Sequence, residues 1–252
     1  MVTVLRLLFF LGLVVIYLVP KEARAASAVT IWPVNPVLGG AAQAAALWLE
    51  NNDHHNVLLQ IRVFRWTQDS AGDQYADQTN IVASPPMASV APGARQLIRL
   101  IRGGTMSSDV EAAYRIVIDE IPTQESQQAA VKSGPQIAIQ IRYSVPFFVY
   151  GAHAPAGAGA PTMVSDIKER PTLHWHIETR NGQRFLAVTN TSQIHAQLSQ
   201  VSLGERTVSA GMLGYVLPGR TMEWPLAANA SGGTLQAVIN GGPKRETIQA
   251  QR

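Results

Sequence analysis

The chain of 252 residues contains no cysteine, which excludes disulfide bonds, zinc–thiolate sites, iron–sulfur clusters and a cysteine nucleophile. Charged residues are few at 15%, and aromatic residues make up only 7%. Hydrophobic residues account for 46%, enough to bury a core, so the chain falls outside the disordered and collagen-like classes. With 20 glycines and 15 prolines, the composition favours short elements joined by turns over a bundle of long helices.

Residues 1–25 have the pattern of a secretory signal peptide. Arg6 precedes an apolar run over 7–19, and Ala23 and Ala25 are small residues at the positions of a cleavage site. A bilayer span takes about 20 apolar residues, so the run is short for the alternative, a membrane anchor. We therefore expect export to a bacterial envelope compartment and no membrane insertion once the signal is removed.

Removal of the signal also changes the charge balance, because it takes away three basic residues and one acidic residue. The mature chain keeps 17 basic and 16 acidic residues, a formal net charge of +1. No block of lysine and arginine remains to attract a polyanion. The composition therefore gives no support for nucleic-acid binding.

Apolar and polar residues alternate with a period of two through most of the mature sequence, and no stretch keeps a helical period over a helix's length. The sequence therefore predicts a mostly β protein. Turn-forming residues such as Pro85, Pro86 and Gly103 separate the segments, and strands of this spacing are typical of a β-sandwich. The predicted strands cover 29–32, 44–50, 58–66, 95–101, 113–121, 135–150, 173–179, 184–189, 196–203, 221–226 and 234–239.

The segment 151–161 consists of glycine, alanine and proline apart from one histidine. Such residues are too small to pack a core, so the segment predicts an interdomain linker. It divides the mature chain into a first domain over 26–150 and a second domain over 162–252. The second domain has about 90 residues, which allows a sandwich with only a modest core.

The end of the first domain is its most apolar part. If it forms one strand, Ile137, Ile139, Ile141 and Tyr143 share a face, because alternate side chains of a strand point the same way. Two interpretations stay open. The segment is either interior, as one long strand or two strands divided near Pro146, or it is an edge strand whose apolar row is meant for another protein.

Three ordered sequence blocks lie ahead of this segment. Residues 84–87 read SPPM, residues 90–99 read VAPGARQLIR and residues 114–122 read YRIVIDEIP. In this order and spacing the blocks resemble the motifs of periplasmic pilus-assembly chaperones, the immunoglobulin-like partners of outer-membrane ushers. The resemblance covers about residues 28–150, whereas the second domain is similar only in being a shorter β domain.

The resemblance implies an all-β fold of two immunoglobulin-like β-sandwich domains joined at an angle, located in the periplasm. It implies a protein that binds, stabilises and caps incomplete pilus or fimbrial subunits and delivers them to an outer-membrane usher. Such a chaperone lends a donor strand to a subunit that lacks one, pairing through main-chain hydrogen bonds and filling pockets with alternate side chains. By the resemblance, the subunit-binding donor strand carries Ile137, Ile139, Ile141 and Tyr143. The alternative is a structural envelope protein, an adhesin or a pilus subunit.

The resemblance is incomplete at the site that anchors the subunit's C-terminal carboxylate. The better-known branch of the family uses an arginine on the first strand and a lysine on the donor strand, and these positions fall near Asn35 and Ser144. Neither residue supplies a positive charge, so the chain is more similar to the archaic or alternative branch. Candidate anchors are Arg99, Arg115 and Arg142, because a guanidinium binds a carboxylate through two parallel hydrogen bonds.

Each of these arginines also has an ordinary explanation, as an exposed strand residue or as one half of a local ion pair. Arg99 is the weakest candidate, since an internal pair with Asp119 or Glu120 explains it equally well.

The sequence gives little reason to expect an enzyme, a cofactor or a metal. It contains no GxSxG elbow, no P-loop and no GxGxxG after a strand. His174 and His176 would share one face of a strand, and an envelope metalloenzyme built around them is a further alternative. Two ligands do not make a metal site, so we expect surface histidines beside Trp175 instead.

Overall fold

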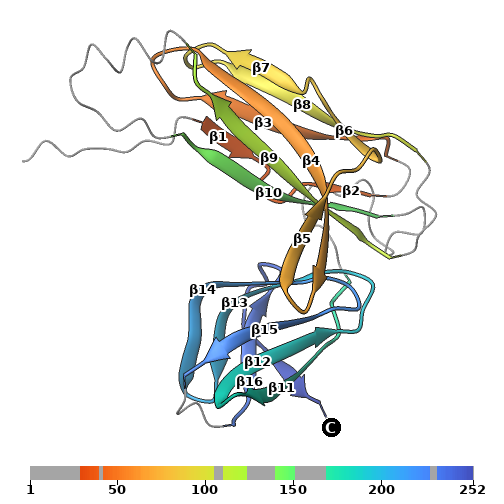
Figure 1. The fold of residues 1–252 in the computed structure, drawn as a ribbon, viewed down its shortest axis with the longest axis vertical. Coiled ribbons are helices and arrows are strands. Elements are labelled where there is room, and N and C mark those ends of the chain that lie inside the picture. The colour runs from red at the N-terminus through yellow and green to blue at the C-terminus, as the bar shows by residue number, and fades with distance from the viewer. Residues whose placement is uncertain are drawn as a thin grey trace, which may run out of the picture.

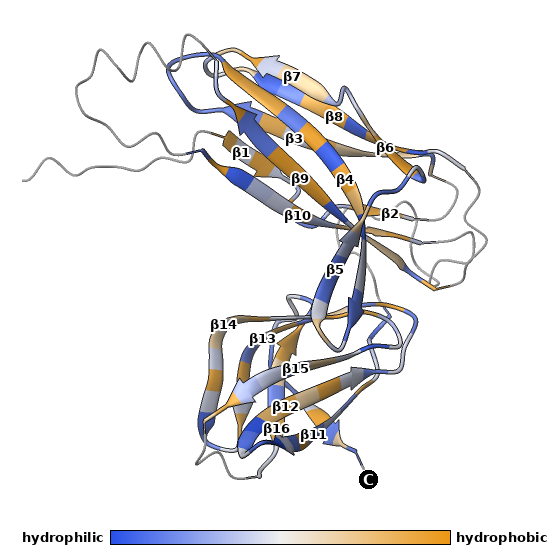
Figure 2. Ribbon diagram, in the orientation of Figure 1, coloured by the Kyte–Doolittle hydropathy of each residue, from blue (hydrophilic) through white to orange (hydrophobic). Residues whose placement is uncertain are grey.

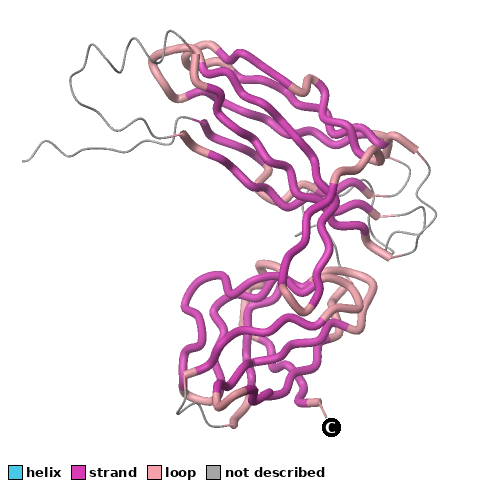
Figure 3. Tube along the Cα trace, in the orientation of Figure 1, coloured by secondary structure: helices cyan, strands magenta, loops and turns pink. Residues whose placement is uncertain are grey.

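The computed structural model describes residues 29–39, 42–104, 110–123, 140–150, 169–227 and 232–251. All regular secondary structure within these ranges is β-strand, which confirms the predicted all-β class (Figure 1, Figure 3). The predicted signal peptide and the predicted linker lie outside the described residues. Within the described ranges no helix is long and apolar enough to cross a membrane.

The first domain is a sandwich of a four-stranded and a six-stranded sheet. The four-stranded sheet has the order β1-β3-β8-β6, and these strands span Val29–Trp32, Ala44–Asn51, Arg95–Arg102 and Ile81–Ser84. The six-stranded sheet has the order β2-β10-β9-β4-β5, spanning Val37–Leu38, Arg142–Val149, Ala112–Ile121, Val57–Asp69 and Gly72–Ala76. A further strand, β7 (Met87–Val90), pairs with β4.

The core of the first domain lies between these two sheets and follows from the alternation in the sequence. On β9, Tyr114, Ile116 and Ile118 are fully buried and belong to the core. Figure 2 shows the same alternation as changes of colour along β4 and β9. Because alternate side chains face opposite sides of a sheet, the residues between them form the outer face of the six-stranded sheet.

The second domain contains one sheet of seven strands in the order β14-β13-β16-β17-β11-β12-β15. It encloses a separate core that includes Trp175, Leu186, Val188 and Leu198. The strands in chain order, β11 to β17, span Leu173–Arg180, Gln183–Asn190, Ala196–Leu203, Arg206–Val216, Thr221–Leu226, Leu235–Ile239 and Glu246–Ala250.

Most predicted strands are present to within a few residues, and the exceptions have identifiable reasons. The last predicted strand of the first domain is shorter than expected, because β10 covers 142–149 and residues 140–141 are not in a strand. Residues 135–139 lie outside the described residues. The strands that the sequence did not predict are either too short for an alternating pattern to stand out or largely exposed: β2, β5, β6, β7, β14 and β17.

The two domains meet at a third buried cluster, which we call the domain joint. It consists of Val37, Trp66, Ala113, Phe148, Tyr150, Ile194, Tyr215 and Leu217. Figure 1 shows the two domains set at an angle, with the β4–β5 hairpin reaching from the first domain to the second.

Candidate functional site

Strand β10 has one edge that is mostly free within the described part of the chain. On one side it pairs with β9 along its whole length, from Arg142 opposite Asp119 to Val149 opposite Ala112. On the other side, β2 pairs only with Phe148 and Val149. The stretch 142–147 therefore presents a row of backbone groups with no neighbouring described strand, and we call it the free edge of β10.

Pro146 fits this position at the edge. Proline has no backbone N–H to donate to a neighbouring strand, so within sheets it occurs mainly on edge strands. Beyond it the edge closes, because the Phe148 N–H donates to the Pro36 carbonyl at 3.3 Å and the Tyr150 N–H donates to the Leu38 carbonyl at 2.8 Å. The free edge thus ends where the domain joint begins.

The residues assigned to the donor strand by resemblance fall in different environments. Ile137 and Ile139 lie outside the described residues. Ile141 is half-buried just before β10, and its carbonyl accepts the Glu120 N–H at 3.3 Å. Tyr143 is half-buried against the first domain's own core, and its hydroxyl accepts the Val29 N–H at 3.3 Å.

The apolar row of β10 is therefore divided along the strand. Val145, Phe147 and Val149 continue the face of Tyr143 and are buried in the core of the first domain. The sequence predicts one continuous apolar row, but the end of this row near the second domain packs into the first domain's own core. Tyr143 also packs against this core while half-buried, and its place in the subunit-binding row stays a prediction.

Arg115 lies on the outer face of β9, directly opposite Pro146 of β10. Its guanidinium carbon is 3.9 Å from the centroid of the Trp66 ring and 5.5 Å from that of the Tyr215 ring. Its Nε atom is buried without a hydrogen-bond partner, and no described carboxylate forms an ion pair with it. A cation held over aromatic rings and lacking a carboxylate partner is suited to binding an anion.

Arg142 is already paired with a carboxylate. Its Nε atom lies 2.5 Å from Oδ1 of Asp119, and Nη2 of Arg62 lies 2.7 Å from Oδ2 of the same residue. Desolvation works to raise the pKa of Asp119, but the hydrogen bonds from both arginines outweigh it and lower that pKa. The cluster lines a surface hollow of about 380 Å³ beside Ile141.

Arg99 is exposed on β8, opposite Ala46 and Ser84 in the four-stranded sheet. It therefore belongs to the sheet that does not contain β10. Neither internal pair that we considered for Arg99 is formed, because the ion pairs of Asp119 are with Arg62 and Arg142, and Glu120 has no ion pair with a described residue. Of the three candidate arginines, only Arg115 combines a position beside the free edge with the absence of a described carboxylate partner.

Two buried polar contacts cross the domain joint, and neither was predicted from the sequence. In the first, Glu111 accepts hydrogen bonds from the His195 backbone N–H at 3.1 Å and from the Tyr150 hydroxyl at 2.5 Å. Its Oε2 atom also lies 2.7 Å from Nδ1 of His195, whose ring stacks on Phe148. Burial and the nearby Glu111 carboxylate raise the pKa of the Tyr150 hydroxyl, which therefore stays protonated as a donor.

The second contact is made by Gln68 at the end of β4, which is buried. Its amide nitrogen donates to the Tyr215 carbonyl at 3.0 Å, and its amide oxygen accepts the Leu217 N–H at 2.8 Å. Because one side chain bonds both a donor and an acceptor of the second domain's backbone, it fixes the β4–β5 hairpin against that domain.

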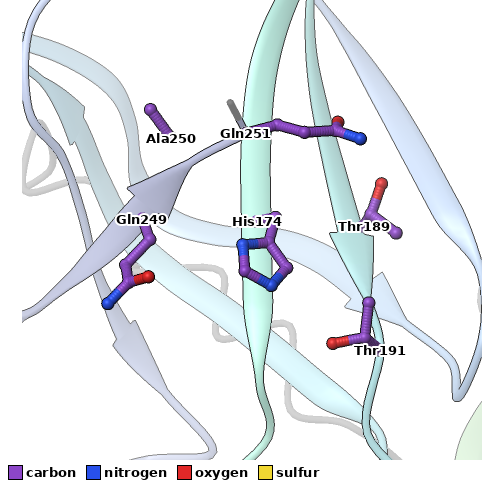
Figure 4. A pocket seen from close by; sticks show the side chains of 6 residues that line it. All are labelled: His174, Thr189, Thr191, Gln249, Ala250 and Gln251. Carbon is purple, nitrogen blue, oxygen red and sulfur yellow. The ribbon is translucent and has the colours of Figure 1, made fainter.

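The histidines considered as metal ligands lie in the second domain, away from β10. His174 lines a hollow of about 400 Å³ together with Thr189, Thr191, Gln249, Ala250 and Gln251 (Figure 4). His176 is two residues further along β11 and is not part of this lining. Across the described residues no group of three or more histidine, aspartate or glutamate side chains could hold a metal ion.

Comparison with known proteins agrees with this arrangement. Residues 28–153 match the family model described as pili and flagellar-assembly chaperone, PapD N-terminal domain. This match spans half of the chain, and the protein belongs to the family of pilus-assembly chaperones of the chaperone–usher pathway. A search of curated proteins gave no match.

Solved structures show the same two-domain fold. One is a chain of the CsuC–CsuE chaperone–tip adhesion subunit pre-assembly complex from the archaic Csu pili of Acinetobacter baumannii, with 28% identity and a TM-score of 0.73. That similarity covers 90% of this chain and 100% of the other. The E. coli chaperone DraB has 16% identity, a TM-score of 0.60, and coverage of 89% of this chain and 98% of its own. The Salmonella enterica structure of the SafA pilin with the SafB chaperone gives 17% identity, a TM-score of 0.60, and coverage of 90% and 97%.

Proposed function

We propose that this chaperone acts in the periplasm, where it binds incomplete pilus subunits by donor-strand complementation and delivers them to an outer-membrane usher. The observation that carries the proposal is the free edge of β10, which ends beside Arg115 at the domain joint. An unpaired strand edge is a template for pairing with another chain. Delivery to an usher rests on membership of the family alone.

The geometry favours one direction for the bound strand. Among the described strands, only β10, at Pro146, lies between Arg115 and the free edge. If Arg115 binds the C-terminal carboxylate of the subunit, the last residues of the subunit run toward the domain joint. This is the direction in which β10 itself runs, so we propose that the subunit strand pairs parallel to β10 along 142–147.

The isoleucines ahead of β10 supply the side chains for the subunit's groove in this proposal. Fully burying an isoleucine contributes about 1.5–3 kcal/mol, so Ile137, Ile139 and Ile141 together favour the complex substantially before ordering costs are subtracted. Tyr143 and the residues after it stay with the chaperone's core and hold β10 in place. The donor strand therefore has a binding part and an internal part, which meet near Tyr143.

Co-expression with a pilus subunit from the same gene cluster tests the proposal. Ile139→Asp places a charge in the subunit's groove and is expected to abolish recovery of a soluble one-to-one complex. Val82→Asp is the matched control, because Val82 is an exposed apolar strand residue on the sheet that does not contain β10. Equal complex yields from both variants would contradict the donor role.

The finished fibre separates this function from the alternative of an adhesin or pilus subunit. A chaperone is absent from purified fibres, whereas a structural subunit is part of them. Detection of this chain as a stoichiometric fibre component would overturn the proposal.

A further inference from the structure

The β4–β5 hairpin connects the domain joint to Arg115 through a chain of polar contacts. Besides its two bonds to the second domain, the Gln68 amide nitrogen donates to Oδ1 of Asp73 at 2.9 Å. The other oxygen of Asp73, Oδ2, accepts a hydrogen bond from the Tyr75 hydroxyl at 3.2 Å. The position of the Tyr75 hydroxyl is thus linked, through Asp73, to a buried contact between the domains.

Tyr75 also lies next to the ring that carries Arg115. In the β4–β5 pairing Tyr75 is directly opposite Trp66, so both side chains project from the same face of the sheet. The Arg115 guanidinium stacks on Trp66, with Tyr215 of the second domain on another side. Burial raises the pKa of the Tyr75 hydroxyl and the positive charge of Arg115 opposes that change, in agreement with the position of both residues beside Trp66.

Packing in the two hydrophobic cores does not explain why a tyrosine occupies position 75. Tyr75 is 51% exposed at the rim of the sheet, so it adds little to either core. An arginine side chain has several rotatable bonds, and fixing it before a ligand arrives lowers the entropy lost on binding. A hydroxyl group held by Asp73 beside the guanidinium is suited to that task.

We propose that Tyr75 is a positioning residue for the carboxylate anchor, holding the Arg115 guanidinium over Trp66 so that its N–H groups face an incoming C-terminal carboxylate. This inference rests on the proposed function, since it requires that Arg115 binds the subunit's terminus. It adds a residue of β5 to a site otherwise formed by Arg115 of β9, Trp66 of β4 and the free edge of β10.

The test compares two forms of the pilus subunit from the same gene cluster, one with its native C-terminus and one extended by a single glycine. The added residue moves the carboxylate without changing the groove. Each form is co-expressed with the chaperone, and the ratio of the two soluble complex yields is the terminus preference. We expect wild-type chaperone to prefer the native terminus at least tenfold and Arg115→Ala to lose this preference.

Tyr75→Phe removes only the hydroxyl and is expected to reduce the terminus preference several-fold while leaving the yield with the extended subunit unchanged. Asp73→Ala removes the carboxylate that accepts the hydrogen bond of the Tyr75 hydroxyl, and it is expected to have the same effect. Thr67→Val removes an exposed hydroxyl elsewhere in the hairpin and is the matched control. Thermal unfolding of each free variant identifies any that fail to fold.

The outcomes distinguish the carboxylate anchor at Arg115 from the positioning role of Tyr75. If wild-type chaperone shows no preference, or if Arg115→Ala keeps it, the carboxylate anchor is wrong. If Arg115→Ala loses the preference while Tyr75→Phe and Asp73→Ala keep it in full, the anchor stands and the positioning role of Tyr75 is overturned.

Discussion

Nδ1 of His195 in the second domain lies 2.7 Å from Oε2 of Glu111 in the first, and the two side chains are only 1% and 0% exposed. This contact, together with the bonds of Gln68, gives the domain joint polar links in addition to its apolar cluster. The strength of a hydrogen bond between buried polar groups depends strongly on its direction. These contacts therefore fix the relative orientation of the domains.

His195→Ala is expected to destabilise the protein by about 3 kcal/mol, because it leaves a buried carboxyl group without one of its partners. Urea unfolding followed by tryptophan fluorescence measures the effect. His174→Ala is the control, since His174 is half-buried at the rim of a hollow and away from the joint, and its loss should cost less than about 0.5 kcal/mol. Equal effects of the two substitutions would mean that the Glu111–His195 contact adds nothing to stability.

Asp119 is expected to make stability depend on pH in the acid range. Its pKa is lowered in the folded protein, so its contribution is present above the unfolded value of about 3.9 and is lost as pH falls through the folded value. Asp119→Asn should therefore lower the free energy of unfolding at pH 6 more than at pH 2. A difference between wild type and variant that stays constant across this range would contradict the assignment.

Arg115 and Arg142 are expected to respond differently to truncation. Arg115→Ala should weaken subunit binding by tenfold or more, since a charge-assisted contact to a carboxylate is worth about 2–5 kcal/mol when truncated. Arg142→Ala should change it much less, because Arg142 is bound to Asp119 within the chaperone. Arg99→Ala, an exposed arginine on the other sheet, is the control. Complex yields on co-expression measure all three, and a larger loss from Arg142→Ala would reassign the anchor.

Tyr143→Phe separates the internal part of β10 from its binding part. The substitution removes the acceptor of the Val29 N–H and should cost about 1 kcal/mol of stability. The ring stays against the core, so subunit binding is expected to persist. Thermal unfolding of the free protein and complex yield measure the two effects, and loss of the complex without loss of stability would return Tyr143 to the subunit-binding row.

The strands could be predicted because alternation is a local property of the sequence. On β9 the fully buried Tyr114, Ile116 and Ile118 alternate with less buried residues, and the polar Arg115 and Asp119 at the alternate positions mark the outer face. The same rule did not divide the apolar row of β10. Whether Tyr143 faces its own core or a partner depends on the strand across the sandwich, where Val29 supplies its backbone N–H, and no pattern within the segment contains that information.

The domain joint could not be predicted for a related reason. Glu111 and His195 are 84 positions apart, and Gln68 and Leu217 are 149 apart. Nothing in the sequence around Glu111, His195 or Gln68 marks these residues as buried. Only the packing of the two domains against each other buries their side chains. The sequence ranked Arg99 last but did not separate Arg115 from Arg142, and the structure separates them because it places Trp66 beneath Arg115 and pairs Arg142 with Asp119.

Amide hydrogen exchange of the chaperone alone and in complex with a pilus subunit tests the central claim most directly. If the subunit adds a strand to the free edge of β10, peptides covering 136–147 should exchange much more slowly in the complex, while β5 at the opposite edge of the same sheet changes little. Unchanged exchange over 136–147 in a complex that is otherwise intact would contradict donor-strand binding through β10.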